Sequence, residues 1–224
     1  MSKHVIQAIN LNLGYNDEYI ISSLNWTLQE GDWVEIQASN SAGKSTLLDS
    51  IYGNPMHCSG QLLVLDYSLI PLNKSDKLEI RRKIGYASQK NRLLLNKTLR
   101  ANLLMALDAS DKVFDQTQDE LISNLLEKLE LKHLVKTEIE HMSNSDQVLV
   151  SIARALINKP KLLLMDQSLD ALDVTRRNMV IELIQQLRQT ERMTILSTSL
   201  FGIAPEITTC KSLRMKNGQF IVGS

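Results

Sequence analysis

Alternating apolar and polar residues open the chain and predict its first elements. Residues 5–13 and about 19–28 alternate with a period of two, which predicts two strands with turn residues 14–17 between them. The apolar runs at 161–165 and 193–198 are continuous, as in strands buried on both faces. Further strands are predicted at 33–37, 61–65 and 84–88, and a closing hairpin at 207–215 and 219–222. The pattern therefore predicts a mixed β core that begins with an antiparallel β segment.

Helical spacing of the apolar residues separates these strands. The predicted helices cover residues 47–52, 76–83, 99–130, 148–157 and 173–189. The long stretch 99–130 interrupts the β/α alternation, so we expect a helical lobe inserted over about 90–157. The remaining parts, about 1–88 and 158–224, are expected to form one core, so that residues 1–224 make a single domain.

One loop carries a pattern typical of phosphate binding. It reads Ala38-Ser39-Asn40-Ser41-Ala42-Gly43-Lys44-Ser45-Thr46 and stands between the predicted strand 33–37 and the predicted helix 47–52. In that context successive backbone N–H groups and the helix dipole hold phosphate oxygens. Lys44 is expected to reach the outer phosphates, and the Ser45 hydroxyl to bind Mg²⁺. The alternative is a Ser/Gly-rich turn that caps an ordinary helix.

Ala38 departs from this pattern, which begins with glycine. Where the turn needs a backbone angle that only glycine takes freely, alanine costs about 1 kcal/mol. We therefore expect a strained loop that still binds phosphate.

Composition narrows the classes of function. The chain has 224 residues with 25 basic and 25 acidic side chains, so its formal net charge of zero argues against nucleic-acid binding and against a polybasic membrane surface. Cys58 and Cys210 lie outside any metal spacing and are expected to be free thiols in a reducing compartment. We find no signal peptide and no apolar run near the ~18 residues that span a bilayer. A cytoplasmic protein that reaches the membrane only through a partner is expected.

Motifs in a fixed order cover nearly the whole chain. They are Tyr15, the phosphate loop, Gln89, and residues 142–146, 151–156, 162–167, 170–173 and 198–199. In this order they resemble the nucleotide-binding domain of ABC transporters, and residues 81–86 and 93–102 are similar to the branch containing FtsE, LolD and the MacB-type ATPases. The resemblance implies an α/β P-loop NTPase fold of the ABC ATPase type.

The resemblance also implies a head-to-tail dimer in which each ATP contacts the phosphate loop of one subunit and the signature motif of the other. Tyr15 is implied to stack on adenine, the alternative being a turn tyrosine. Asp166 and Gln89 are implied to contact Mg²⁺ together with Ser45, although Gln89 could also be an exposed loop residue. The implied ATP contacts are Tyr15, Ser39, Asn40, Ser41, Ala42, Gly43, Lys44, Ser45, Thr46, Gln89, Asp166 and Ser143.

Two positions that carry hydrolysis in the family are changed. The family places a glutamate directly after the strand-end aspartate, but this chain has Gln167, whose amide cannot accept a proton. Losing such a base typically costs ~10²–10⁴ in rate. The family's switch histidine is replaced by Ser199, which brings no imidazole.

The signature motif is changed as well. The family's Leu-Ser-Gly-Gly-Gln stands here as Met142-Ser143-Asn144-Ser145-Asp146, so Ser143 remains while both glycines are lost. Asp146 adds a negative charge beside a polyanion, a repulsion of about 3 kcal/mol at ~6 Å and an effective dielectric constant of ~20. Mild substitutions in a working ATPase are the alternative, but three separate losses predict weak or absent hydrolysis.

The expected function is therefore a degenerate ATP-binding subunit of an inner-membrane ABC-type complex. It would bind Mg-ATP, form a homodimer or a heterodimer with a related subunit, and dock an integral membrane partner near residues 89–104. Leu93, Leu94 and Leu95 either form an apolar socket for that partner or belong to the core of the lobe. One alternative is a slow but active ATPase that powers transport or a mechanical signal, and another is a soluble ABC protein outside transport.

Overall fold

The chain folds around two sheets, seen in a computed structural model that describes residues 3–15, 18–54, 57–88, 93–110, 112–202 and 210–221. The first sheet is antiparallel and has the strand order β2-β1-β4-β5. Its strands are β1 (His4–Tyr15), β2 (Glu18–Gln29), β4 (His57–Val64) and β5 (Tyr67–Ser68). Gly14 and Tyr15 lie inside β1, so the predicted turn at 14–17 begins too early; residues 16 and 17 are outside the described part.

The second sheet is parallel except at one edge, with the order β10-β9-β3-β8-β7-β6. Its strands are β3 (Trp33–Gln37), β6 (Ile84–Ser88), β7 (Leu162–Asp166), β8 (Thr194–Ser199), β9 (Cys210–Lys216) and β10 (Gln219–Ile221). Every residue of β7 and β8 is buried, as their continuous apolar runs predicted. The predicted closing hairpin is confirmed at β9 and β10, while residues 207–209 and 222 lie outside the described part.

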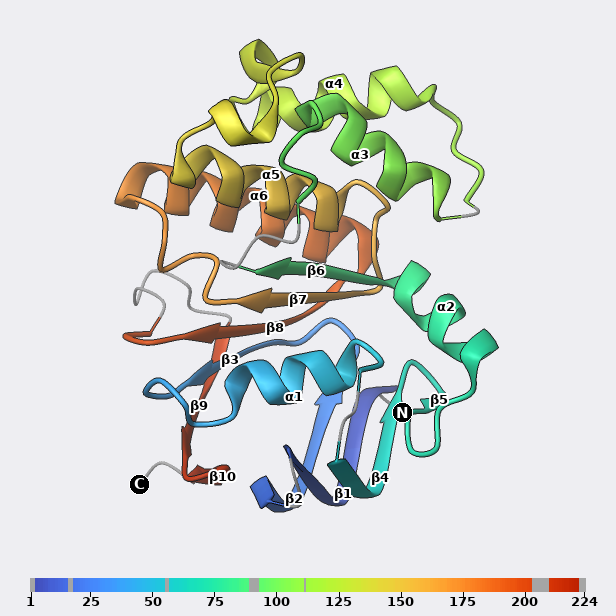
Figure 1. Cartoon of the computed structure of the whole chain (residues 1–224), viewed down its shortest axis with the longest axis vertical. Helices are drawn as coiled ribbons and strands as arrows, with labels where there is room; N and C mark the ends of the chain where they lie inside the picture. Colours follow the sequence, from blue (N-terminus) through green and yellow to red (C-terminus); the bar gives the residue numbers. More distant parts are fainter. Residues whose placement is uncertain are drawn as a thin grey trace.

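Six α-helices are described around these sheets. They are α1 (Lys44–Ile51), α2 (Lys74–Lys83), α3 (Leu99–Asp108), α4 (Gln118–Lys128), α5 (Asn144–Leu156) and α6 (Val174–Glu191), with short 3₁₀ turns at Lys132–Leu134 and Ile139–His141. Helix α1 lies between the two sheets, whereas α5 and α6 cover the opposite face of the parallel sheet and α3 and α4 lie outermost (Figure 1). The phosphate loop therefore leaves the middle of the parallel sheet and enters a helix that is packed on both sides.

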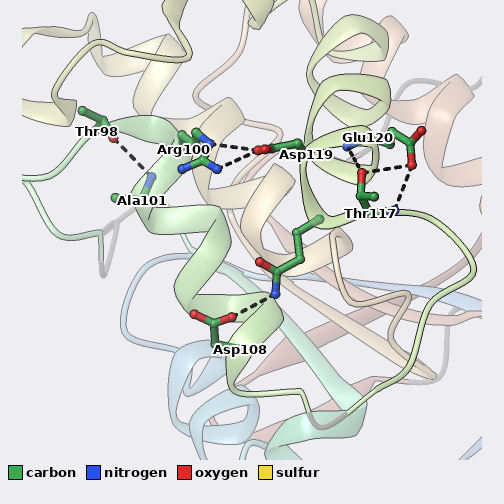
Figure 2. Close-up of polar contacts among 8 residues, drawn as sticks. Thr98, Arg100, Ala101, Asp108, Thr117, Asp119 and Glu120 are labelled. Atoms are coloured by element: carbon green, nitrogen blue, oxygen red, sulfur yellow. Dashed lines mark hydrogen bonds and ion pairs between the residues drawn. The ribbon is translucent and has the colours of Figure 1, made fainter.

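The predicted helical stretch 99–130 is two helices rather than one. Residues 109–117 separate α3 from α4, because Thr117 begins a new helix with a capping box: its hydroxyl accepts from the N–H of Glu120, whose carboxylate accepts from the N–H of Thr117. An ion pair between Arg100 and Asp119 then joins the two helices (Figure 2). The spacing of apolar residues alone did not indicate the break between α3 and α4.

Both cysteines are free, as expected. Burial raises the pKa of the Cys210 thiol to about 12, and the nearby Glu35 carboxylate acts in the same direction. Cys210 therefore stays protonated and unreactive near neutral pH.

Candidate functional site

The carboxyl ends of four parallel strands meet at one edge of the second sheet. Registers pair Ser88 with Asp166, Asp166 with Thr198, and Gln37 with Ser199. Asp166, Ser199 and the strand end that precedes the phosphate loop therefore lie at the same edge of the sheet, which is where parallel α/β sheets bind ligands.

The phosphate loop spans residues 38–43 and ends in Gly43, the N-cap of α1. Gly43 has φ +98°, which demands glycine, and a Cβ there would also lie 3.0 Å from the Ile20 side chain, a tight contact. Ser41 also takes a left-handed angle, φ 63°. Ser39, Asn40 and Ser41 are exposed, which leaves this part of the loop open to solvent.

The strain expected at Ala38 is absent. The described non-glycine residues with positive φ include Ser41 but not Ala38, so the first position of this loop needs no glycine. The strain was expected at the wrong residue: Ser41 has the positive φ, and its signal in the sequence was a small polar side chain in the middle of a tight loop.

Lys44 is buried and turned back onto the loop. Its ammonium donates to the carbonyls of Ala38 and Ser39, the second at 2.8 Å. Burial lowers the pKa of Lys44, and the carboxylates of Asp166 and Asp170 act against this shift. The loop thus holds a lysine whose charge is partly desolvated and lies within the field of two acids.

The next residues of α1 extend the loop toward β1. Ser45 and Thr46 are half-buried in the first turn of the helix. The Thr46 hydroxyl donates to the Tyr15 hydroxyl at 3.4 Å, so Tyr15 lies beside the start of α1. The Tyr15 ring is therefore near the loop, while its predicted stacking on a base stays a prediction.

Asp166 ends β7 and is buried. The Thr198 hydroxyl donates to its Oδ1 at 3.0 Å, which fixes the carboxylate against the neighbouring strand. Thr198 is a positioning residue: the motif at 198–199 contained it, but no role was expected for its hydroxyl. The only signal in the sequence for this role was the position of Thr198 at the end of the predicted strand 193–198.

Gln167 and Ser199 are the two residues that the resemblance places where a base and a switch histidine are expected. Gln167 has φ 52°, and its N–H points to Thr198, with the carbonyl at 3.2 Å and the hydroxyl at 3.1 Å. The Ser199 hydroxyl is buried and accepts from the N–H of Gly202 at 3.0 Å. Neither side chain supplies a group that takes a proton near neutral pH. Gln89 lies outside the described residues.

The signature-like segment begins α5 and is held by α6. Ser143 is the N-cap, and its hydroxyl accepts from the N–H of Asp146 at 3.1 Å and donates to Oδ2 of that residue at 2.5 Å. Arg176 of α6 pairs with Oδ1 of Asp146 at 2.8 Å and donates to the Ser145 hydroxyl at 2.9 Å. Asp146 was expected to add an uncompensated negative charge, but Arg176 forms an ion pair with it. Among the described residues no hydrogen bond or ion pair joins this segment to the phosphate loop.

A family model described as ABC transporter matches residues 21–170. The chain belongs to the ABC transporter family. The macrolide export ATP-binding/permease protein MacB of Campylobacter jejuni is 31% identical over 96% of this chain and 33% of the relative, so this chain spans about a third of that relative. The lipoprotein-releasing system ATP-binding protein LolD of Buchnera aphidicola is 30% identical over 84% of each chain. The family predicted from the ordered motifs is thereby confirmed.

Solved structures confirm the predicted fold. The dimeric structure of MJ0796, a bacterial ABC transporter cassette, has a TM-score of 0.87 at 24% identity and covers 97% of both chains. CbiO1 from Clostridium perfringens, part of the ABC transporter complex CbiONQ, has a TM-score of 0.79 at 23% identity and covers 98% of this chain and 87% of the other. The chain therefore has the fold of an ABC ATPase cassette. Among the helices within the described ranges, none has the length and apolar character needed to cross a bilayer.

Proposed function

We propose that this chain is the ATP-binding subunit of a membrane ABC transporter complex, that it binds Mg-ATP with weak or no hydrolysis, and that nucleotide-dependent pairing couples it to a membrane partner. The observation that carries the proposal is the contrast at one sheet edge. Gly43, Lys44 and Asp166 supply a glycine turn, a cation and a carboxylate of the kind that phosphate and Mg²⁺ sites use, whereas Gln167 and Ser199 bring no base. This edge of the sheet therefore has side chains suited to binding a nucleotide but no side chain that can accept a proton from water near neutral pH.

The donor chemistry at this edge fits Mg²⁺. The Asp166 carboxylate and the Ser45 hydroxyl are hard oxygen ligands, which Mg²⁺ prefers together with phosphate oxygens and water. When bound, the ion neutralises charge on the nucleotide's phosphates. In this proposal Thr198 holds the Asp166 carboxylate in place, and the N–H groups of the loop bind the phosphates.

The names of the relatives favour a membrane complex. MacB is named an ATP-binding/permease protein, and LolD is named the ATP-binding protein of a lipoprotein-releasing system. This chain aligns with about a third of MacB, so the match to that relative covers only part of it.

A groove on the structure suits such a partner. A cavity of about 540 Å³ opens between α2, β6, α3 and α5. Leu94 and the exposed side chains of Leu78 and Met105 line it, while Leu93 is buried and belongs to the core. The socket predicted from residues 93–95 therefore rests on Leu94, and we assign the groove to an apolar segment of the membrane partner.

Titration calorimetry with Mg-ATP tests the binding half of the proposal. Wild-type protein should give a saturable signal, and Lys44→Ala should abolish it because the loop loses its cation. Lys97→Ala, which removes an exposed lysine of the helical region, is the matched control and should bind normally. Wild-type protein that gives no heat at millimolar ATP contradicts the proposal.

Steady-state hydrolysis tests the catalytic half. The isolated chain should stay near background, and Gln167→Glu should recover little, because residues that act as a unit are not additive. A wild-type turnover of about 1 s⁻¹ or more lies in the ordinary enzyme range and would favour the slow but active ATPase instead.

A further inference from the structure

At the start of α5, Ser143 and Asn144 are exposed, but contacts within the chain occupy the Ser143 hydroxyl, the Ser145 oxygen and the Asp146 carboxylate. The Ser143 hydroxyl accepts from the N–H of Asp146 and donates to the Asp146 carboxylate, so its single donor hydrogen is already in use. The Ser145 hydroxyl accepts from Arg176, whose guanidinium pairs with Asp146. Thus the Ser143 hydroxyl hydrogen and the Arg176 guanidinium, two donors that a phosphate would use here, are bound to groups of the same chain.

The charges at this surface also oppose a phosphate. Arg176 is the cation, but it lies 2.8 Å from Asp146 and 3.8 Å from Asp173. Two carboxylates around one guanidinium leave the cluster negative at neutral pH. Partial burial raises the pKa of Asp146, but the hydrogen bond from Ser143 and the pair with Arg176 outweigh it and hold that pKa below its ordinary value. Asp146 therefore stays ionised at neutral pH.

We infer that the Asp146–Arg176 pair closes the signature surface to phosphate, so that the chain contributes its phosphate loop but not its signature segment to a nucleotide-bound pair. This inference rests on the proposed function, because it assumes pairing around ATP. A second copy of the chain would present the same closed surface to both nucleotides. The partner that fits is a different cassette whose corresponding helix start offers free N–H and hydroxyl donors.

Self-association in saturating Mg-ATP, measured by sedimentation velocity, tests the closure. Wild-type protein should remain monomeric. Asp146→Asn removes the charge and replaces a charged acceptor of the Ser143 hydroxyl by a weaker neutral one, so its association constant should rise by about tenfold or more. Asp146→Gln, measured in parallel, makes the same test if the asparagine variant folds poorly. Adding Ser143→Ala to Asp146→Asn should cancel the gain.

Asp119→Asn is the matched control. Asp119 also lies in the first turn of a helix and pairs with an arginine of a neighbouring helix (Figure 2), yet it belongs to α4 rather than to the signature segment. This variant should behave like wild type.

The outcomes separate the inference from the proposed function. Wild-type protein that dimerises with ATP as strongly as Asp146→Asn overturns the closure, and so does an Asp146→Asn protein that binds ATP in calorimetry but stays monomeric. In both cases ATP binding itself stands. If no variant binds ATP, the proposed function fails and the closure fails with it.

Discussion

Ser41, rather than Ala38, carries the backbone strain of the phosphate loop. Its φ of 63° places an L-residue in the left-handed region, which costs about 1 kcal/mol. Ala38 has no such angle, and its N–H donates to the Ser199 carbonyl at 3.3 Å, which ties the loop to β8. The departure visible in the sequence and the strain in the structure therefore belong to different residues.

Glycine substitutions at these two positions should have opposite effects. Ser41→Gly relieves the left-handed strain, whereas Ala38→Gly only adds freedom to the unfolded chain. We expect the free energy of unfolding of Ser41→Gly to exceed that of Ala38→Gly by about 1 kcal/mol in urea titrations. Equal values for the two variants would show that the angle at Ser41 costs nothing.

The Asp146 carboxylate should make stability depend on pH. Because its pKa lies below the ordinary value in the folded state, the unfolded chain binds more protons as the solution is acidified through the window between the two values. Its contribution is therefore complete above the ordinary value of about 3.9 and is lost as the pH falls through the folded value.

Urea unfolding of wild type and Asp146→Asn across this window measures the effect. The difference in unfolding free energy should be full near about pH 7 and should vanish in strong acid. Asp119→Asn serves as control, since its exposed ion pair should contribute at most about 1 kcal/mol. A difference between wild type and Asp146→Asn that stays constant down to strong acid would rule out the pair with Arg176 as its source.

At the scale of elements, N-cap residues set where several helices of this chain begin. Thr98, Thr117, Ser143 and Asp173 each cap a helix through a side-chain oxygen that accepts from a backbone N–H. The capping box at Thr117 divides a continuous apolar period into α3 and α4, and a hydrogen bond from Gln118 to Asp108 spans the break. An N-cap can therefore begin a new helix inside a stretch that apolar periodicity alone would predict as one helix.

Thr117→Ala should destabilise the protein by about 1 kcal/mol, because it leaves the first N–H groups of α4 without their acceptor. Thr190→Ala is the matched control: this hydroxyl donates to the Gln186 carbonyl one turn back inside α6, where alanine is the better helix former. Thermal unfolding of both variants gives the comparison. A loss for Thr190→Ala as large as that for Thr117→Ala would show that the capping box has no special weight.

At the scale of the whole molecule, the two sheets and the outer helices present separate surfaces. The phosphate loop lies at the start of α1, between the sheets (Figure 1), while the groove opens between α2, β6, α3 and α5. Strand β6 lines the groove and its last residue, Ser88, pairs with Asp166 at the nucleotide edge. One strand therefore connects the proposed partner groove with the proposed nucleotide site.

Leu94→Asp should release the protein from its membrane partner. Leu94 is 38% exposed and lines the groove, whereas Leu95 is 49% exposed and is not among the lining residues, so Leu95→Asp is a control with the same chemistry. Recovery with native membranes, with the neighbouring genes co-expressed, should fall about tenfold for Leu94→Asp and stay near wild type for Leu95→Asp.

ATP calorimetry on both aspartate variants shows whether each has folded. Equal loss for the two variants would place the contact outside the groove. If wild-type protein stays wholly in the soluble fraction, the membrane assignment fails and the soluble ABC protein becomes the better account.

The sequence by itself determined the elements and the chemistry that is local to them. Periodicity and motif spacing depend on neighbours along the chain. They therefore predicted the buried strands β7 and β8, the phosphate loop before α1, and the replacements at Gln167 and Ser199. Only the tertiary structure decided which distant groups meet. Arg176 reaches Asp146 from another helix, Thr198 reaches Asp166 from another strand, and Leu94 separates from Leu93 at the edge of the groove. These contacts depend on how helices and strands pack, and no local pattern in the chain specifies them.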